Sequence, residues 1–194
     1  MYTSMDQAIL GYKSMHELAN SEIRLGHYEA AKEWWLKALE VEPRSFSSVI
    51  ELIGAAISAK DFPVANAMLD SVLQSEGYCL TWAQFQYKQQ EAIMGPGGGL
   101  NFLTTFVDHN PDAHAVRLEL ATQLIERKKP NDAIPHLLRL DDFGVPPASF
   151  KMGQLCMAAG DFDGAYHWMQ RASLLDPGND EARETMQKLA KATA

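Results

Sequence analysis

The stretch LGHYEAAKEWWLKALEVEP, residues 25–43, has two relatives further along the same chain. They are AKDFPVANAMLDSVLQSEG, residues 59–77, and AGDFDGAYHWMQRASLLDP, residues 159–177. In each stretch a turn residue is followed by an aromatic residue two places later, by an alanine three places further on, and by a large apolar residue four places after that. Self-similarity over segments of this length predicts a repeat architecture, in which each segment belongs to one supersecondary unit.

The separation of equivalent residues fixes the period of the repeat. Tyr28 and Phe62, the aromatic residues of the first two stretches, are separated by about 34 residues, a period typical of helical repeats. Pro43 precedes Pro111 by twice this period, whereas Phe162 follows Phe62 at two residues less than three periods. We therefore expect five repeats with one deletion of two residues, near Val145.

Within each period, apolar residues recur at intervals of three and four on two successive segments, which is the pattern of two amphipathic helices. Alanine where the two helices cross lets their axes approach, and glycine between them can adopt the positive φ of a helix C-cap. One helix pair cannot bury both of its apolar faces, so neighbouring pairs must stack. The sequence therefore predicts an all-α solenoid.

These residues resemble the tetratricopeptide repeat, a helix–turn–helix unit of about 34 residues. The matching residues are Ala19, Gly26, Tyr28, Ala31, Trp35, Ala38 and Pro43 in the first repeat, Phe62, Ala65 and Leu69 in the second, Ala121, Ala133 and Leu137 in the fourth, and Gly153, Gly160, Phe162, Ala165, Met169, Ala172 and Pro177 in the last. The second repeat departs from the family pattern, with Lys60 in the place of the usual glycine. The resemblance implies a right-handed α-solenoid of about five such units.

We expect the repeats near residues 12–45, 46–79, 80–113, 114–145 and 146–179, within a single domain of residues 1–194. Residues 180–194 read as a C-terminal capping helix, with Asn179 or Asp180 as its N-cap. Its apolar side consists of Ala182, Met186 and Leu189, and Lys188 and Lys191 lie near its negative C-terminal end. A polar outer face of this kind closes a repeat stack.

The N-terminal residues also have a helical pattern. Ser4-x-x-Gln7 resembles a capping box, and Met5, Ala8, Ile9 and Tyr12 continue the apolar face of the first repeat helix backwards. We therefore expect this helix to be longer than the others.

The stretch MGPGGGLNF, residues 94–102, is rich in glycine in the manner of a phosphate-binding loop. A P-loop needs a following Lys and Ser or Thr, and a dinucleotide-binding loop needs a preceding buried strand. Here Leu100-Asn101-Phe102 follows, and a helix is expected on each side. The sequence favours a turn between the two helices of the third repeat over a phosphate site, with the second helix starting late, near Leu100.

Composition excludes several classes of function. A formal net charge of −8 argues against nucleic acid as the main ligand, because such proteins present an excess of Lys and Arg to the phosphates. No window approaches the ~18 apolar residues that a membrane helix needs, and the first residues have no signal-peptide pattern. We expect a cytoplasmic protein without nucleic-acid or membrane partners.

Few residues in the sequence suggest a catalytic or metal-binding site. Cys79 and Cys156 lack the spacing of a metal site and are too far apart in the stack for a disulfide. The run from Asp108 to His114 contains side chains that bind metals, but it lies at a turn between repeats, where Asn, Pro and Asp are common. The pair Asp141-Asp142 is interpreted as a solvated turn, and Trp34-Trp35 as core packing. We expect no enzyme activity, no cofactor and no metal.

The surface of the predicted solenoid is the remaining candidate for function. In the resembled family, the first helix of each repeat lines the concave side, chiefly through its second, fifth, ninth and twelfth positions. The residues predicted to form a partner-binding groove here are His16, Asn20, Ile50, Ile57, Gln84, Lys88, Glu91, Leu118, Thr122, Ile125, Phe150, Gln154 and Met157. Six of them are apolar at positions where stacking needs no apolar residue, which indicates a binding site. Two alternatives stay open. The curvature of the superhelix could bury these six residues, or the register of the second repeat could be shifted by one residue.

Some members of the family hold a partner's C-terminal carboxylate with basic and amide side chains. Asn20 occupies one such position, but His16, Glu51, Thr81 and Phe85 replace the others, and Glu51 would repel a carboxylate. We therefore exclude that ligand class.

Two functions remain. The first is a non-enzymatic adaptor or chaperone-like module that binds a peptide segment or helix of a partner protein in the groove. The alternative is a scaffolding or assembly subunit that self-associates, as a homodimer, through the N-terminal helix from Met5 to Tyr12.

Overall fold

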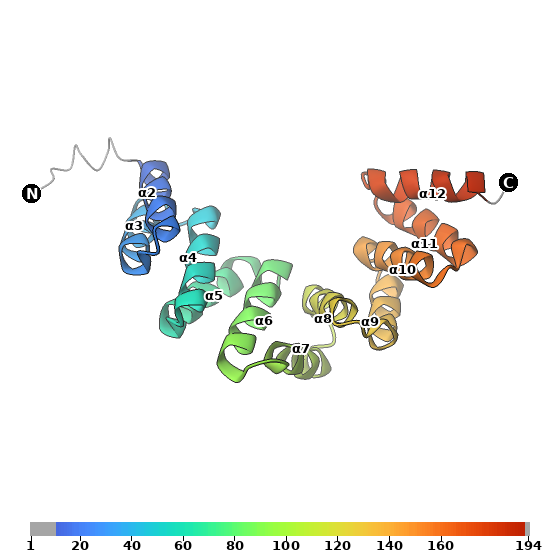
Figure 1. The fold of residues 1–194 in the computed structure, drawn as a ribbon, viewed down its shortest axis with the longest axis horizontal. Coiled ribbons are helices and arrows are strands. Elements are labelled where there is room, and N and C mark those ends of the chain that lie inside the picture. Colours follow the sequence, from blue (N-terminus) through green and yellow to red (C-terminus); the bar gives the residue numbers. More distant parts are fainter. Residues whose placement is uncertain (1–10, 193–194) are drawn as a thin grey trace, which may run out of the picture. The chain divides into compact units, whose positions relative to one another are not determined.

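The computed structural model describes residues 11–192, and the side chains of residues 11–190. Over this range the chain forms eleven α-helices and no strand (Figure 1). In order they are α2 (Tyr12–Arg24), α3 (Tyr28–Val41), α4 (Phe46–Ala59), α5 (Phe62–Glu76), α6 (Leu80–Met94), α7 (Gly98–His109), α8 (His114–Glu126), α9 (Pro130–Asp142), α10 (Pro146–Ala159), α11 (Phe162–Leu175) and α12 (Asp180–Ala192). The predicted fold class, an all-α chain of helix–turn–helix pairs with a final additional helix, is confirmed.

The helix starts follow the period of the sequence. The first helices of the five pairs begin at Tyr12, Phe46, Leu80, His114 and Pro146. The first three of these intervals equal the period of the repeat, and the last is two residues shorter. The short interval ends at the turn of Val145, where the sequence predicts the deletion. The longer first helix predicted from Ser4 to Ile9 lies outside the described residues.

The turn between α6 and α7 requires one correction. α7 begins at Gly98, not near Leu100. The start is nevertheless late. The interval from the start of α6 to the start of α7 is two residues longer than the interval from the start of α2 to the start of α3. The helix begins before Leu100 because the Glu91 carboxylate accepts hydrogen bonds from the backbone N–H groups of Gly97 and Gly99 at 3.0–3.1 Å, which supplies an N-terminal cap.

Backbone contacts divide the described residues into two compact bodies. The N-terminal body contains residues 11–77 and 85–99, and the C-terminal body contains residues 78–84 and 100–192. The division therefore passes through α6 and α7, and each body is described separately below. The expectation of a single domain stays a prediction.

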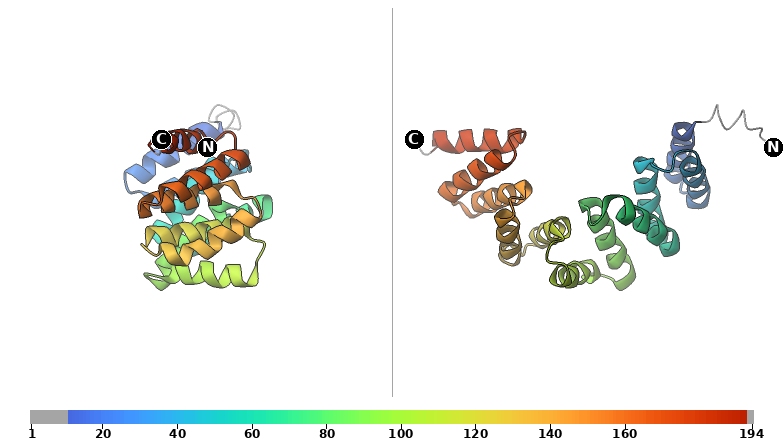
Figure 2. Two further views of the ribbon diagram at one scale, coloured as in Figure 1. Left: turned by 90° about the vertical axis from the view of Figure 1, so that its right-hand side faces the viewer. Right: turned by 180° about the vertical axis from the view of Figure 1, so that it is seen from behind.

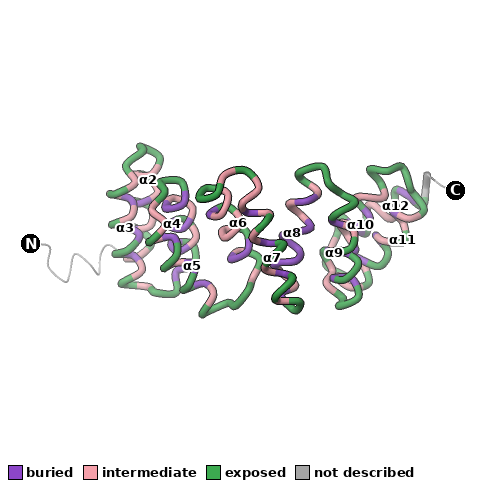
Figure 3. Tube along the Cα trace, turned by 90° about the horizontal axis from the view of Figure 1, so that it is seen from below, coloured by how far each residue is buried: buried purple, intermediate pink, exposed green. Residues whose placement is uncertain are grey.

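The N-terminal body has the core that the repeated residues predict. Ala19, Ala31, Trp35 and Leu52 form one cluster in which each residue is fully buried. All views agree in placing α2 against α3 (Figures 1 and 2), and Figure 3 shows buried positions within the helix pairs and exposed residues at the turns. The small side chains let the helices approach closely around the indole of Trp35. The assignment of the tryptophan pair to packing therefore holds for Trp35.

A polar link joins the second helices of the first two repeats. Asp61 at the start of α5 accepts hydrogen bonds from the Tyr28 hydroxyl at 2.9 Å and from Lys32 Nζ at 3.0 Å. It also caps α5 by accepting from the N–H of Val64 at 3.4 Å. Burial and the neighbouring Asp61 carboxylate raise the pKa of Tyr28 above its ordinary value, so the phenol stays protonated and donates.

The C-terminal body has a second core at its end. Met169, Ala172 and Ala182 form a buried cluster, against which Phe150 and Met186 pack. α11 lies between α10 and α12 (Figure 2). The capping-helix prediction is confirmed here, because Asn179 Oδ1 accepts from the N–H of Ala182 at 3.0 Å and α12 begins at Asp180.

The interpretation of Asp141 as a solvated turn residue is wrong. Asp141 is 6% exposed and receives the guanidinium of Arg171, whose Nε lies 2.7 Å from each carboxylate oxygen. The buried hydroxyl of Ser149 donates to the same carboxylate. Arg171 is distant in sequence, on α11, so the pair links the second helices of the last two repeats. Asp142 is exposed, as expected.

Candidate functional site

The thirteen residues predicted to bind a partner are on the first helices of the repeats, as their spacing requires. In the N-terminal body they are His16 and Asn20 on α2, Ile50 and Ile57 on α4, and Lys88 and Glu91 on α6. In the C-terminal body they are Gln84 on α6, Leu118, Thr122 and Ile125 on α8, and Phe150, Gln154 and Met157 on α10. The structure thus provides two candidate surfaces, one on each body.

The surface on the N-terminal body is only partly accessible. Lys88 is exposed and its Nζ lies 5.1 Å from the centre of the Phe85 ring. Asn20 and Ile50 are half-buried, whereas Ile57 is only 8% exposed. α4 packs against both α3 and α5, and a helix covered on two sides buries a wider stripe than one at an end. Ile57 therefore belongs to the core more than to a binding surface.

His16 makes a contact that resembles the start of a catalytic pair. Its Nδ1 lies 3.0 Å from the hydroxyl oxygen of Ser48, which lies 3.0 Å from that of Ser45. Ser48 is fully buried, so its hydroxyl cannot reach a substrate. The contact joins α2 to α4 and satisfies a buried hydroxyl, which is a structural role.

Two of the residues predicted to bind a partner in the C-terminal body are instead packed within the body. Leu118 is 8% exposed. Phe150 is half-buried and packs against the cluster of Met169, Ala172 and Ala182. The expectation of six exposed apolar contacts is therefore not met in full, since neighbouring helices cover some of these side chains.

The remaining residues of this body form what we call the α8–α10 surface: Gln84, Thr122, Ile125, Gln154 and Met157. Met157 is 39% exposed, Gln84 and Gln154 are exposed, and Ile125 and Thr122 are half-buried. Thr122 donates its hydroxyl proton to the carbonyl of Leu118 at 2.8 Å, so it presents a methyl group and a spare acceptor lone pair. The surface combines apolar contacts with side-chain amides.

Next to this surface lies a buried carboxylate that sequence reasoning missed. Glu119 on α8 is 2% exposed, and Gln123 Nε2 donates to its Oε1 at 2.9 Å. Burial raises the pKa of the Glu119 carboxyl above its ordinary value, and the amides of Gln123 and Gln84 and the charge of Lys151 oppose this only in part. A weak signal was present in the sequence, since Glu119 lies between the apolar residues Leu118 and Leu120.

Backbone N–H groups of the glycine-rich turn already have an acceptor. The Glu91 carboxylate occupies the backbone N–H groups of Gly97 and Gly99 that an anion would need. Glu91 was predicted to contact a partner, but in the structure its carboxylate holds this turn. The turn interpretation therefore has a physical basis in an internal anion.

The described residues include neither a metal-binding cluster nor a membrane-spanning helix. Within them, no group of three His, Cys, Asp or Glu side chains is placed to hold a metal ion. The His109 imidazole in the acidic turn donates from Nδ1 to the carbonyl of Thr105 at 2.8 Å. Of the eleven helices described, none combines the length and apolar character that crossing a bilayer would demand.

Comparison with known proteins agrees with this architecture. The family model described as tetratricopeptide repeat matches residues 12–45. A thermophilic tetratricopeptide repeat protein of Thermus thermophilus superimposes with a TM-score of 0.54 at 16% identity, covering 93% of this chain and 99% of the other. A comparison with curated protein sequences finds no match.

Two further solved structures have the same fold. The type IV pilus biogenesis factor PilW has a TM-score of 0.52 at 15% identity, with 94% of this chain and 86% of that chain covered. Yeast Tom70 has a TM-score of 0.54 at 14% identity, with 97% of this chain but only 41% of Tom70 covered. At these identities the likeness establishes the fold and nothing about ligands.

Proposed function

Because this chain is a tetratricopeptide repeat protein, with a matched repeat at residues 12–45 and the fold of that family, we propose that it is a non-catalytic protein–protein interaction module of adaptor or chaperone type. The partner is a protein, bound through a segment that lies on the first helices of the repeats. The proposal includes the cytoplasmic location expected from the sequence, and no cofactor.

The α8–α10 surface is the observation that carries this proposal. Met157 exposes 39% of its surface at a position where packing within its repeat does not use it. Ile125 occupies the equivalent position of α8, and Thr122 and Gln154 are equivalent one turn earlier. Apolar side chains bordered by exposed polar groups are typical of protein-binding surfaces.

The composition of this surface favours an extended segment over a helix. Half-burying Met157 and Ile125 contributes only ~2–3 kcal/mol before the costs of association. Further affinity has to come from the amides of Gln84 and Gln154, which can donate to and accept from a peptide main chain. An extended segment has main-chain groups free for this, whereas a helix has already paired its own. We therefore expect affinities in the micromolar range or weaker for one segment.

A capture experiment with matched variants tests the proposal. Purified wild-type chain is immobilised, and the proteins it captures are compared with those captured by Met157→Glu and by Leu174→Glu. Leu174→Glu is the control, because Leu174 is 75% exposed on α11 and lies off the proposed surface. Circular dichroism checks that both variants remain helical. Loss of the same captured proteins with Met157→Glu but not with Leu174→Glu supports the surface, and equal capture by all three chains removes it. Ile57 and Leu118 are unsuitable targets, because both are buried.

A second candidate function is self-association at the N-terminal end. Leu18 on α2 and Leu25, which directly follows this helix, are 38% and 68% exposed and are two helical turns apart in sequence. The sequence predicts an amphipathic helix over the preceding residues, which would add further apolar side chains. Light scattering after size-exclusion chromatography would separate the two functions: a dimer that becomes a monomer when the first eleven residues are deleted supports assembly, and a monomer in both forms leaves the adaptor function.

A further inference from the structure

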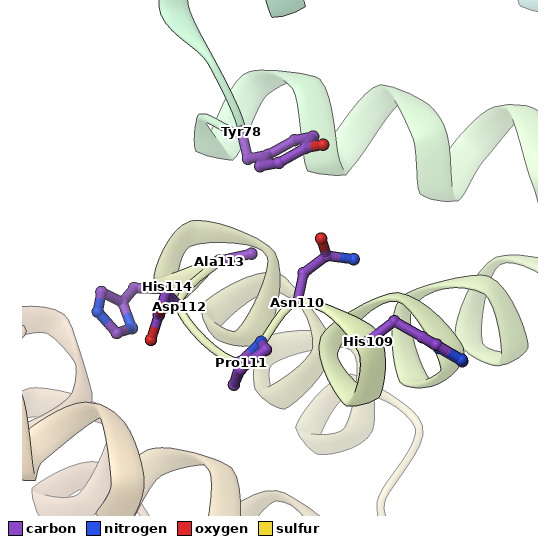
Figure 4. A pocket seen from close by; sticks show the side chains of 7 residues that line it. All are labelled: Tyr78, His109, Asn110, Pro111, Asp112, Ala113 and His114. Atoms are coloured by element: carbon purple, nitrogen blue, oxygen red, sulfur yellow. The ribbon is translucent and has the colours of Figure 1, made fainter.

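The C-terminal body has a pair of adjoining hollows away from the α8–α10 surface. The larger, of about 540 Å³, is lined by Tyr78, His109, Asn110, Pro111, Asp112, Ala113 and His114 (Figure 4). The smaller, of about 240 Å³, is lined by Phe102, Thr105, Phe106, His109 and Asn110. His109 and Asn110 belong to both, so the two hollows follow the last turns of α7 and meet at its C-terminal end. The larger lies within the range of known ligand pockets.

Aromatic rings form one wall. The Tyr78 ring is 5.0 Å from Phe106 and 5.3 Å from Trp82, measured between ring centres, and Phe102 is 5.7 Å from Phe106. Tyr78 is nevertheless 44% exposed, and Phe102 and Phe106 are half-buried. This aromatic cluster therefore holds Tyr78 in place while leaving part of its ring open to the hollow. The faces of such rings carry negative potential.

The polar groups of the hollow are acceptors. Asn110 Nδ2 donates to the carbonyl of Phe106 at 3.0 Å, so its Oδ1 remains as an acceptor, and Figure 4 shows that oxygen pointing toward Tyr78 across the hollow. Because a carbonyl can only accept, His109 donates from Nδ1 to Thr105, which leaves the lone pair of Nε2 available in the neutral ring. Asp112 contributes an exposed carboxylate at the rim, on the side of His114 and directed away from Tyr78 (Figure 4), so it acts on a ligand at Tyr78 only through its charge.

His109 and His114 line the larger hollow, but no side chain with a permanent positive charge does. No lysine or arginine is among the residues that line either hollow. The nearby Arg117 is 7% exposed and donates to the carbonyls of Val107 and Pro111 at 3.3 Å, so it stays within the core. The guanidinium of Arg139 lies over Phe143 at 6.0 Å, on a different ring.

We propose that this hollow binds an arginine side chain of a partner protein. The planar guanidinium stacks on Tyr78 and donates to Asn110 Oδ1, while the Asp112 carboxylate attracts its charge. Arginine suits this arrangement better than lysine, since its flat donor group covers a ring and serves separate acceptors at once. The net charge of −8 on the chain favours a basic partner over an acidic one. This site differs from the α8–α10 surface and does not depend on it.

The test is an NMR titration of the full chain with two short peptides that differ in one group. The first is acetyl-Gly-Ser-Arg-Ser-Gly-amide, and the second has citrulline, a neutral analogue of the same shape, in place of arginine. We expect the arginine peptide to shift the signals of Tyr78, His109 and Asn110, and the citrulline peptide to bind about tenfold more weakly. Equal binding of the two peptides, or no shift at these residues up to about 10 mM arginine peptide, overturns the proposal.

Variants make the test specific to the site. Tyr78→Ala should weaken binding of the arginine peptide by about tenfold. Asp112→Asn should weaken it by about threefold, and binding to this variant should depend less on salt than binding to the wild type. Phe46→Ala is the matched control, because Phe46 is also 44% exposed but lies on α4 in the N-terminal body. If Phe46→Ala weakens binding as much as Tyr78→Ala does, or if Tyr78→Ala has no effect in a chain with unchanged helix content, the assignment to this hollow is wrong.

Discussion

Replacing Glu91 by alanine removes the acceptor that holds the glycine-rich turn. In the structure the Gly97 N–H lies 3.0 and 3.1 Å from the two carboxylate oxygens, and the Gly99 N–H lies 3.1 Å from one of them. Hydrogen bonds to a charged acceptor contribute about 1.5–3 kcal/mol each when buried, and loss of a helix cap costs about 1 kcal/mol. Glu91 is half-buried and water can replace part of the interaction, so we expect a loss of ~2 kcal/mol in the free energy of unfolding.

Urea denaturation of the wild type, Glu91→Ala and Glu91→Gln measures this loss. The glutamine variant keeps a neutral acceptor and should fall between the other two. For a chain of this size, a loss of about 2 kcal/mol corresponds to a decrease in Tm of roughly 4–8 °C. Glu33→Ala serves as the control, because Glu33 is exposed on α3.

Amide hydrogen exchange locates the effect. In Glu91→Ala the N–H groups of Gly97 and Gly99 should exchange faster, and the start of α7 should retreat toward Leu100, while amides at the centre of α3 change only with global stability. Unchanged exchange at both glycines, or a loss of stability below about 0.5 kcal/mol, would show that the carboxylate does not cap the helix.

Three further outcomes follow from single positions. Burial raises the pKa of Glu119, so the folded state binds the Glu119 proton more tightly than the unfolded state does. Above its folded pKa the ionised carboxylate therefore lowers the free energy of unfolding. This loss disappears as the pH falls toward the ordinary pKa of 4.5. Glu119→Gln should therefore be favoured over the wild type near pH 7 and lose that advantage near pH 4, in denaturation curves measured across this range. Lys60 has a left-handed φ of 61°, so Lys60→Gly should gain ~0.5–1 kcal/mol in chemical denaturation, whereas Lys37→Gly within α3 should lose about 1. A Cβ on Gly99 would lie 2.5 Å from the carbonyl oxygen of Tyr87, so Gly99→Ala should lower the midpoint of thermal unfolding by several degrees, while Gly54→Ala, whose Cβ would make only an ordinary contact with Phe85 at 3.7 Å, should not.

The repeat explains why so much of the fold could be predicted. Ala31, Trp35 and their counterparts recur at one spacing, so each observation of the pattern supported the others, and fully buried side chains are found at these positions. Lys60 shows that a register can survive a non-consensus residue, because it adopts the left-handed conformation that a glycine would have had.

Contacts that are particular to this chain were harder to predict. Asp141 looked like a turn residue because its partner Arg171 is far away in sequence and on a different repeat. The cap on α7 comes from Glu91, which precedes the glycines by a full turn or more, so the short-range rules for N-caps do not find it. The aromatic cluster around Tyr78 combines a residue before α6 with residues from α7, which no single-helix periodicity displays.

The residues predicted to form a binding groove lie on the first helices of the repeats, but fewer of their apolar side chains are exposed than the sequence predicts. Position within a repeat tells which side of a helix a residue occupies, but the exposure of that side depends on how far its neighbours cover it. Ile57 of α4 and Met157 of α10 occupy equivalent positions on helices that each pack against two neighbours, yet Ile57 is 8% exposed and Met157 is 39% exposed. The sequence contains the first kind of information and lacks the second, so exposure has to be taken from the structure.

Two long-range ion pairs link neighbouring repeats. In the N-terminal body Lys32 on α3 reaches Asp61 at the start of α5, and in the C-terminal body Arg171 on α11 reaches Asp141 at the end of α9. Both pairs join second helices of adjacent repeats, although the hydroxyl of Ser149 on the first helix α10 also donates to Asp141. Met157 takes part in neither pair, so a partner at the proposed α8–α10 surface could contact it without displacing them. Substitutions at Asp61 or Asp141 should for this reason change stability, and substitutions at Met157 should change binding at nearly constant stability.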